Sequence, residues 1–227
     1  MFFSKKYKTY LFTVITLIIA ASYSTVKAQD WREEMKNLRY SPRYFGPNAF
    51  PMPELRSGRI DTRVEAELRG EYHTFEGDRT KDIYLRLFVP IAEGRAGFEV
   101  NYVIYEYYNM DQETVKERHA AGTSWRNGAH GDVIFSSFFQ VLNSDKWADI
   151  MFEATIKTAS GNRLADARYT DAASYWFDLN IGRNIYESTD KSTTVRLQGL
   201  AGFYCWMTND LIHRQNDALV YSAGISG

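Results

Sequence analysis

The chain of 227 residues has a length that suits one domain with a short extension. Its 27 Lys and Arg residues almost balance its 28 Asp and Glu residues, so it offers no basic surface for nucleic-acid phosphates, and we expect no nucleic-acid partner. A single Cys excludes a disulfide scaffold and a Cys-based zinc or iron–sulfur cluster. After residue 28 no apolar run approaches the roughly 18–20 residues of a membrane-spanning helix, which excludes a helical membrane bundle.

Residues 1–28 have the pattern of a secretory signal peptide. Three lysines among residues 5–8 precede the uncharged apolar stretch Leu11–Ala21, and Val26 and Ala28 stand at positions −3 and −1 of a cleavage site. An uncleaved anchor helix is the alternative, which the short apolar stretch disfavours. The sequence therefore predicts an exported protein that is cleaved after Ala28.

Residues 59–72 alternate without an error between two kinds of side chain. The even positions are apolar or small, whereas the odd positions 59–71 are all charged. A period of two is typical of a strand with one apolar and one polar face, since a helix would scatter both sets around its circumference. The pattern recurs, less regularly, in residues 82–89, 98–105, 132–141, 150–157, 175–182 and 194–203, and in a last run that begins at Ala218. The sequence predicts an all-β meander.

The connections between these runs favour a membrane barrel. Residues 109–129, 159–173 and 208–217 form long connections, and they alternate with the shorter ones 91–96, 143–148 and 187–192; the first, 74–80, is too short to count as long. Transmembrane barrels place short turns in the periplasm and long loops outside. We therefore predict an antiparallel up-and-down transmembrane β-barrel in the outer membrane of a diderm bacterium. A soluble periplasmic barrel or sandwich is the alternative.

Residues 29–58 differ in composition from the predicted barrel, residues 59–227. They hold four of the five prolines, with aromatic residues between them. Prolines at this density prevent both a helix interior and a central strand. The aromatic residues favour packing over a free linker. We expect this Pro- and aromatic-rich segment on the periplasmic side, inserted into the barrel mouth or capping it.

Seven full strands and part of an eighth are visible in the sequence. Single-chain bacterial barrels have an even number of strands, and residues 224–227 are poor strand material because of their two glycines. We therefore expect an incomplete barrel of ten to twelve strands that continues beyond Gly227. Closure with eight strands, in which residues 218–227 pair with residues 59–72, is the alternative.

The charged faces of the strands supply the candidate lumen lining. If the apolar sets face lipid, the lumen-lining residues are Arg63, Glu65, Glu67, Arg69, Arg86, Glu99, Glu153, Lys157, Asp178 and Arg196. Five cations balance five anions in this set. A strongly selective pore has one dominant sign at its constriction, whereas a balanced set readily forms internal salt bridges. Two interpretations stay open: a charge ladder that holds the strands in register, and a solute-conducting lumen.

One stretch carries a resemblance to a known group. Residues Ile156–Asn162, followed by Tyr169–Asp171 and Tyr175–Asp178, resemble segments of uncharacterised outer-membrane barrels of the Bacteroidota. They are similar in style to the strand–loop–strand unit of the broad transporter-like, phenol-degradation-pathway barrel group. The resemblance implies an outer-membrane location and a barrel fold, and it brings no catalytic residues.

These features predict a small-solute channel or transport-type barrel, with outer-membrane lipid, the barrel assembly machinery and a small solute as partners. A structural or surface-interaction barrel without transport is the alternative, and a lipid-acting enzyme is less favoured. His130, Asp132 and Ser136 share one strand face, but same-face neighbours stand about 7 Å apart, too far for a catalytic triad. No Gly-rich phosphate loop, metal-spaced His pair or nucleophile elbow is found. We expect no enzyme activity, cofactor or metal.

Overall fold

The computed structural model describes residues 38–120, 126–144, 146–190, 192–208 and 217–227. The predicted signal peptide, residues 1–28, and the beginning of the Pro-rich segment lie outside these residues. The strands are β1 (Glu65–Phe75), β2 (Asp78–Ile91), β3 (Ala96–Met110), β4 (Arg126–Ala129), β5 (Val133–Leu142), β6 (Asp149–Lys157), β7 (Ser174–Glu187), β8 (Thr194–Cys205) and β9 (Asp217–Ser226). The helical elements are α3 (Gln112–Arg118) and the 3-10 turns η1 (Pro42–Tyr44), η2 (Ala92–Gly94) and η3 (Leu164–Asp166).

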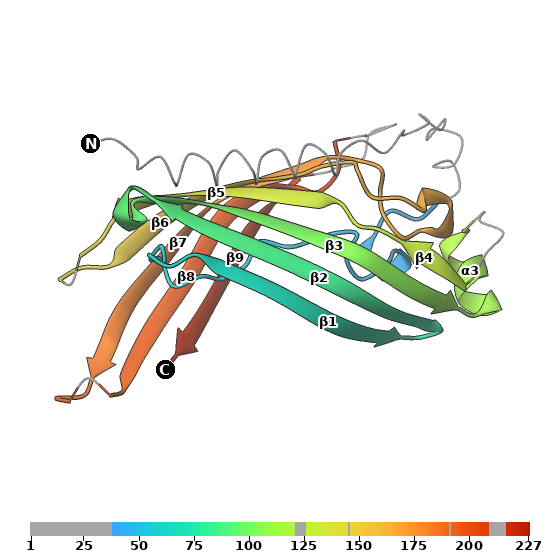
Figure 1. Ribbon diagram of the computed structural model, residues 1–227. Coiled ribbons are helices and arrows are strands. Elements are labelled where there is room, and N and C mark those ends of the chain that lie inside the picture. The colour runs from blue at the N-terminus through green and yellow to red at the C-terminus, as the bar shows by residue number, and fades with distance from the viewer. Residues whose placement is uncertain (1–37, 121–125, 145, 191, 209–216) are drawn as a thin grey trace. The chain divides into compact units, whose positions relative to one another are not determined.

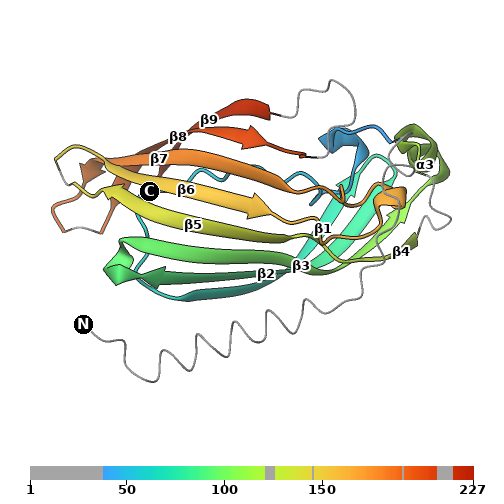
Figure 2. The same cartoon turned by 90° about the horizontal axis from the view of Figure 1, so that it is seen from above.

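The strands form one antiparallel sheet in the order β1-β2-β3-β5-β6-β7-β8-β9. The short β4 pairs with the C-terminal part of β3, beyond the residues of β3 that pair with β5. The sheet curls into an open half-barrel (Figures 1 and 2). The predicted all-β antiparallel meander is therefore confirmed. Among the described residues no helix is both long and apolar enough to cross a membrane.

The two edges of the half-barrel are β1 and β9. The described parts of these strands do not pair with each other, so the eight-strand closure is not formed here. Strand β9 is longer than we expected, because Gly224–Ser226 pair with Arg196–Gln198 of β8. Backbone pairing needs no side chain, and small residues are accommodated beside a neighbouring strand. A total of ten to twelve strands stays a prediction.

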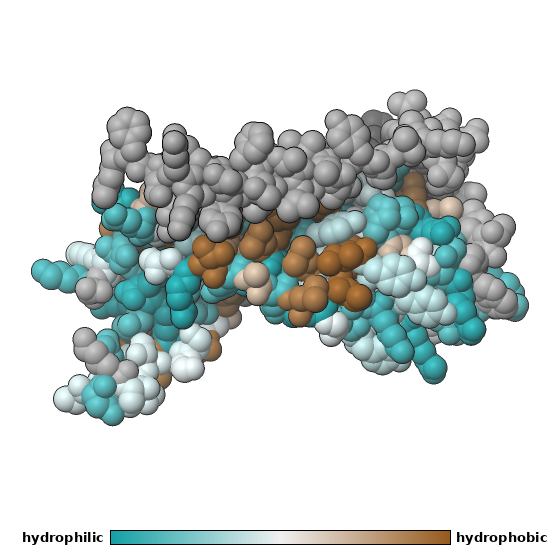
Figure 3. All heavy atoms as spheres, viewed as in Figure 1, coloured by the Kyte–Doolittle hydropathy of each residue, from teal (hydrophilic) through white to brown (hydrophobic). Residues whose placement is uncertain are grey.

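The two faces of the sheet differ in polarity, as the alternation predicts. We call the concave side, toward which the sheet curls, the inner face, and the convex side the outer face. Buried polar residues of the inner face include Glu99, Asn101, Glu153, Thr155, Lys157, Asp178 and Asn180. Exposed apolar residues of the outer face include Phe98, Phe135, Phe139, Ile156, Phe177, Leu179 and Leu197. Figure 3 shows apolar side chains gathered over the middle of the strands, with hydrophilic side chains toward the strand ends.

The first connection is a tight turn, which corrects the predicted loop 74–80. Strands β1 and β2 extend to Phe75 and Asp78, so that only Glu76 and Gly77 join them. Gly77 has φ of +70°, and a Cβ there would lie 2.5 Å from a carboxylate oxygen of Asp111. Glycine is therefore required for both conformation and space.

The strand bounds keep the predicted alternation for the other connections: more residues separate β3 from β5, β6 from β7 and β8 from β9 than separate β2 from β3, β5 from β6 and β7 from β8. We call the end of the sheet at Met110, Lys157 and Cys205 the long-connection end, and the end at Ile91, Leu142 and Glu187 the short-connection end.

Residues 38–64, the inner strap, lie inside the curve of the sheet (Figure 1). At the long-connection end the backbone N–H of Gly46 donates to the carbonyl of Ala167. At the short-connection end the N–H of Ile60 donates to Gln140 on β5. The described part of the Pro-rich segment therefore runs along the inner face and is not confined to one mouth of the half-barrel. Strand β1 begins at Glu65 and not at Arg59 because the residues before it belong to this strap.

A small apolar core fixes the strap to the sheet. Ile60 packs with Phe88, Phe138 and Met151, and all four side chains are buried. The rings of Phe88 and Phe138 meet edge to face at a centroid distance of 5.9 Å. This geometry is favourable for aromatic pairs. The cluster covers the inner face of β2, β5 and β6 near the short-connection end.

Removing the Phe138 ring should lower the free energy of unfolding by about 3–5 kcal/mol, because its site is buried and well packed. Phe139, the next residue, is 48% exposed on the outer face and provides a matched control. Phe139→Ala should cost about 1 kcal/mol or less. Urea unfolding of the refolded protein, followed by circular dichroism, measures both. Equal losses would contradict the assignment of the two faces.

Candidate functional site

The middle of the inner face holds a buried cluster of charges around Arg56 of the strap. Its guanidinium makes two hydrogen bonds to the carboxylate of Glu99 on β3, at 2.8 and 3.3 Å. Its Nε lies 3.2 Å from Oε2 of Glu153 on β6, an ion pair without hydrogen-bond geometry. The guanidinium also lies 4.7 Å from the ring centroid of Phe138. One strap side chain thus joins three strands of the sheet.

Two neighbours complete this cluster. Arg86 on β2 donates from Nε to Glu99 at 2.7 Å and from Nη1 to Glu65 at 3.0 Å. Asp178 on β7 accepts from Asn180 at 2.6 Å, whereas its other oxygen is buried without a hydrogen-bond partner. We call Arg56, Arg86, Glu99, Glu153 and Asp178 the middle cluster. It has three carboxylates and two guanidinium groups, so carboxyl groups outnumber guanidinium groups by one at the centre of the inner face.

The short-connection end is held by a second set of contacts. Arg196 on β8 and Arg59 of the strap both bind the carboxylate of Asp149 on β6. Arg196 also donates from two nitrogens to the backbone carbonyl of Ser57, at 2.9 and 2.7 Å. A Cβ at Gly182 of β7 would lie 1.9 Å from that same carbonyl oxygen. The strap therefore approaches the sheet so closely that only glycine fits at this position.

The long-connection end is closed by Arg168, which lies in the connection between β6 and β7. Its fully buried side chain binds Glu106 and Asp78, each at 2.7 Å, and Thr80 at 2.8 Å. Burial lowers the pKa of Arg168, but the carboxylates of Glu106 and Asp78 more than offset this, so that its pKa is raised. Arg118 of α3 also pairs with Asp78, at 2.8 Å. A loop, a helix and two strands are thus joined by one buried network.

The ten candidate lumen residues do not all lie together. Five are buried on the inner face: Glu99, Glu153, Lys157, Asp178 and Arg196. Three are half-buried: Glu65, Glu67 and Arg86. Arg63 and Arg69 are exposed; the first precedes β1 and pairs with Asp61, and the second pairs with Glu67 and Glu71. Lys157 is paired with Asp132 at 2.7 Å near the long-connection end.

Sequence reasoning missed several residues of the inner face. Arg56 and Arg168 lie in segments without strand periodicity, so the alternation gave no reason to choose them. Asp78 and Glu106 lie on extensions of β2 and β3 beyond the predicted runs. Had Glu76 and Gly77 been interpreted as a two-residue hairpin turn, the first two strands would have been predicted to reach Phe75 and Asp78.

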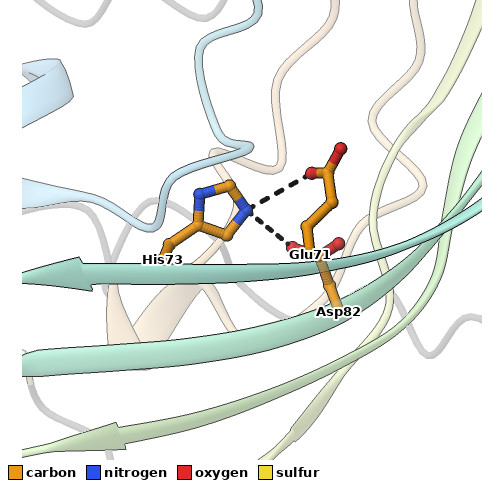
Figure 4. A group of neighbouring side chains, drawn as sticks. All are labelled: Glu71, His73 and Asp82. Atoms are coloured by element: carbon orange, nitrogen blue, oxygen red, sulfur yellow. Dashed lines mark hydrogen bonds and ion pairs between the residues drawn. The ribbon is translucent and has the colours of Figure 1, made fainter.

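One group of the described residues has the arrangement of metal ligands. Glu71 and His73 lie on β1 and Asp82 on β2, and one ligand atom from each lies within 4.8 Å of the others. His73 Nε2 lies 3.3 Å from Glu71 Oε2 and 3.0 Å from Asp82 Oδ2 (Figure 4). Asn48 of the strap donates to Asp82 at 3.0 Å. We did not expect this group from the sequence.

The residues weighed for catalysis have other partners. Asp132 accepts from Lys157 and from the backbone of Gly161, at 2.7 and 2.6 Å. Ser136 shares a hydrogen bond of 2.7 Å with Thr155. His130 lies before β5 and bonds through its backbone to Asn162. The described contacts therefore do not join His130, Asp132 and Ser136 into a triad.

Comparisons of the chain with protein-family models, with curated proteins and with solved structures found no match.

Replacing Arg56 should leave the buried carboxylate of Glu153 without its cation and should leave Glu99 with Arg86 as its remaining cationic partner. We expect Arg56→Met to lower the free energy of unfolding by about 3–5 kcal/mol, as for other broken buried ion pairs. Adding Glu153→Gln should recover part of this loss, because it removes one unpaired charge. The measurement is urea unfolding of the three proteins.

Arg63→Met is the matched control, because the side chain of Arg63 is 81% exposed and its ion pair is with the partly exposed Asp61. It should change stability by about 0.5 kcal/mol or less. If Arg56→Met behaves like this control, the strap is not held by the middle cluster.

Proposed function

We propose that the chain is an outer-membrane β-barrel protein of the transport type, which passes a small polar or cationic solute along its inner face. The observation that carries the membrane location is the exposed apolar band of the outer face. On it Phe98 stacks with Phe135 at 5.7 Å, and Phe152 lies between Phe139 and Phe177 at 6.5 and 6.4 Å. These two groups of aromatic rings lie on the outer face of four neighbouring strands, and such an apolar face is suited to lipid and unfavourable in water.

The hydrogen bonding of the backbone supports the same location. Hydrocarbon offers no partner for N–H and C=O groups, and β2, β3, β5, β6, β7 and β8 are each paired on both sides along most of their length, whereas the short β4 is paired with β3. The predicted signal peptide accounts for export, and the barrel assembly machinery for insertion. In this proposal the long connections lie outside and the short ones in the periplasm.

The acidic middle cluster supports a cationic solute. Of the cations in the balanced set, Arg63 and Arg69 are exposed, and Lys157 and Arg196 are paired near the ends of the inner face. Because these four cations lie elsewhere, the three carboxylates of the middle cluster outnumber its two guanidinium groups. A dominant sign at the narrowest polar region selects ions of the opposite sign.

A structural or surface-interaction barrel without transport is the second candidate. The observation that favours it is the strap, whose side chain Arg56 occupies the centre of the inner face. A strap held by buried ion pairs can close the interior permanently. A lipid-acting enzyme is less favoured, because the residues weighed for a triad are engaged elsewhere.

Planar-bilayer recording of the refolded chain separates the first two candidates. We expect conductance steps whose reversal potential in a KCl gradient shows cation preference. Arg56→Ala should increase the conductance, because it frees the centre of the inner face, whereas Arg63→Ala should leave it unchanged. A wild-type protein and an Arg56→Ala variant that are both silent would contradict transport and leave the structural candidate.

Leu68 and Glu67 test the membrane itself. Leu68 is 68% exposed on the outer face and Glu67 lies on the inner face of the same strand. Leu68→Arg should hinder insertion into liposomes, because a cation at mid-bilayer costs about 2–4 kcal/mol. Glu67→Gln should insert like the wild type in a flotation assay. Normal flotation of Leu68→Arg together with failure of Glu67→Gln would mean that the faces are assigned the wrong way round.

A further inference from the structure

Glu71, His73 and Asp82 form a compact group on the inner face beside the tight turn. Glu71 and Asp82 are directly opposite each other in the register of β1 and β2, and His73 follows Glu71 on the same face. Two carboxylates in opposed positions destabilise a sheet unless a cation lies between them. The next strand places Glu106 opposite Asp82, but Arg168 pairs with Glu106, so the carboxylates in need of a cation are Glu71 and Asp82.

The neighbouring donors satisfy this group only in part. Arg69 pairs with Oε1 of Glu71 at 3.0 Å. Asn48 and His73 both lie 3.0 Å from Oδ2 of Asp82. The side chain of Asp82 is fully buried, and its Oδ1 has no hydrogen-bond partner. A buried carboxylate oxygen without a partner loses its hydration and gains nothing in return. This oxygen belongs to a carboxylate that points at His73 (Figure 4).

The two separations from His73 fit ligands around one ion. His73 Nε2 faces a carboxylate on two sides, at 3.3 and 3.0 Å, although one N–H can donate a good hydrogen bond to only one of them. Ligand atoms bound at roughly 2.1 Å to a tetrahedral or octahedral ion stand roughly 3.0–3.4 Å apart. Glu71 and His73 are half-buried, so water can reach the remaining coordination positions.

We propose that Glu71, His73 and Asp82 bind a divalent transition-metal ion of the Zn²⁺ class. One imidazole and two carboxylates suit Zn²⁺ or a similar first-row ion, whereas Ca²⁺ takes six to eight oxygen ligands. The ion offsets the opposed charges of Glu71 and Asp82 and joins β1, the free edge of the sheet, to β2. Asn48 orients the Asp82 carboxylate, so the strap also supports the site. The proposal goes beyond transport and does not depend on it.

Titration calorimetry of the refolded, tag-free full chain with ZnCl2 alone tests the site. We expect one saturable Zn²⁺ site and no comparable CaCl2 site. His73→Gln and Glu71→Gln should each weaken Zn²⁺ binding at least about 100-fold, because even outer-shell partners contribute about 10–100-fold to metal affinity. His119→Asn removes an exposed imidazole at the end of α3, where Asn tolerates the left-handed backbone, and should leave the affinity unchanged.

Co²⁺ provides a second readout that does not depend on a heat of binding. The Co²⁺-loaded wild type should show visible absorption bands of a nitrogen- and oxygen-bound ion, and His73→Gln should lose them while its circular dichroism spectrum stays that of the folded protein. No Zn²⁺ binding by the folded wild type would overturn the proposal. Binding that survives in His73→Gln and Glu71→Gln, or that is lost in His119→Asn, would also overturn it.

Discussion

The pairing of charges on the inner face is the constraint on which the rest of the structure depends. Glu153 on β6 and Asp178 on β7 are directly opposite each other, and Glu99 lies on β3, across β5 from them; all three are buried. Of the cations on the strands, Arg86 pairs with Glu99. Arg56 comes from outside the sheet, and this requirement explains why the strap lies where it does. Isolated buried charges are costly, so a sheet without its strap would have to admit water or other cations.

The other strap contacts follow from that position. Once Arg56 is fixed, Ser57 meets Arg196 and the close backbone approach at Gly182, and Ile60 reaches the apolar core. At the opposite end Asn48 reaches Asp82. The strap thus couples the middle cluster to both ends of the half-barrel. Any opening of the inner face has to break several of these contacts together.

The alternation of side chains predicted the strands and their two faces well, because a repeat of two residues identifies a strand and also assigns each side chain to a face. On β6 it separated the buried Glu153 and Lys157 from the exposed Ile156. It predicted less where the chain departs from that period. The sequence predicted a loop at residues 74–80 where the structure has a tight turn at Gly77. Without that turn the sequence could not predict the register in which Glu71 lies opposite Asp82. A metal-ligand group formed across two strands is visible in a sequence only when the turn between them is fixed.

The strap shows a different limit. Its prolines and aromatic residues indicated that it packs on the barrel, but its partners lie far away in the sequence and follow no local pattern. Arg56 meets Glu99 and Glu153 only after the sheet has curled. The excess of carboxylates in the middle cluster is likewise a property of the folded chain, since the charges of the predicted lumen set balance in number.

The central claim is that the apolar face meets lipid and the charged face meets water and the strap. Spin labels at residues 65–70 of β1, introduced singly into a Cys205→Ala background in liposomes, test it most directly. Collisions with oxygen should peak at Ala66, Leu68 and Gly70, and collisions with a water-soluble nickel chelate at Glu65, Glu67 and Arg69. Profiles without a period of two, or with the two reagents exchanged, would contradict the account.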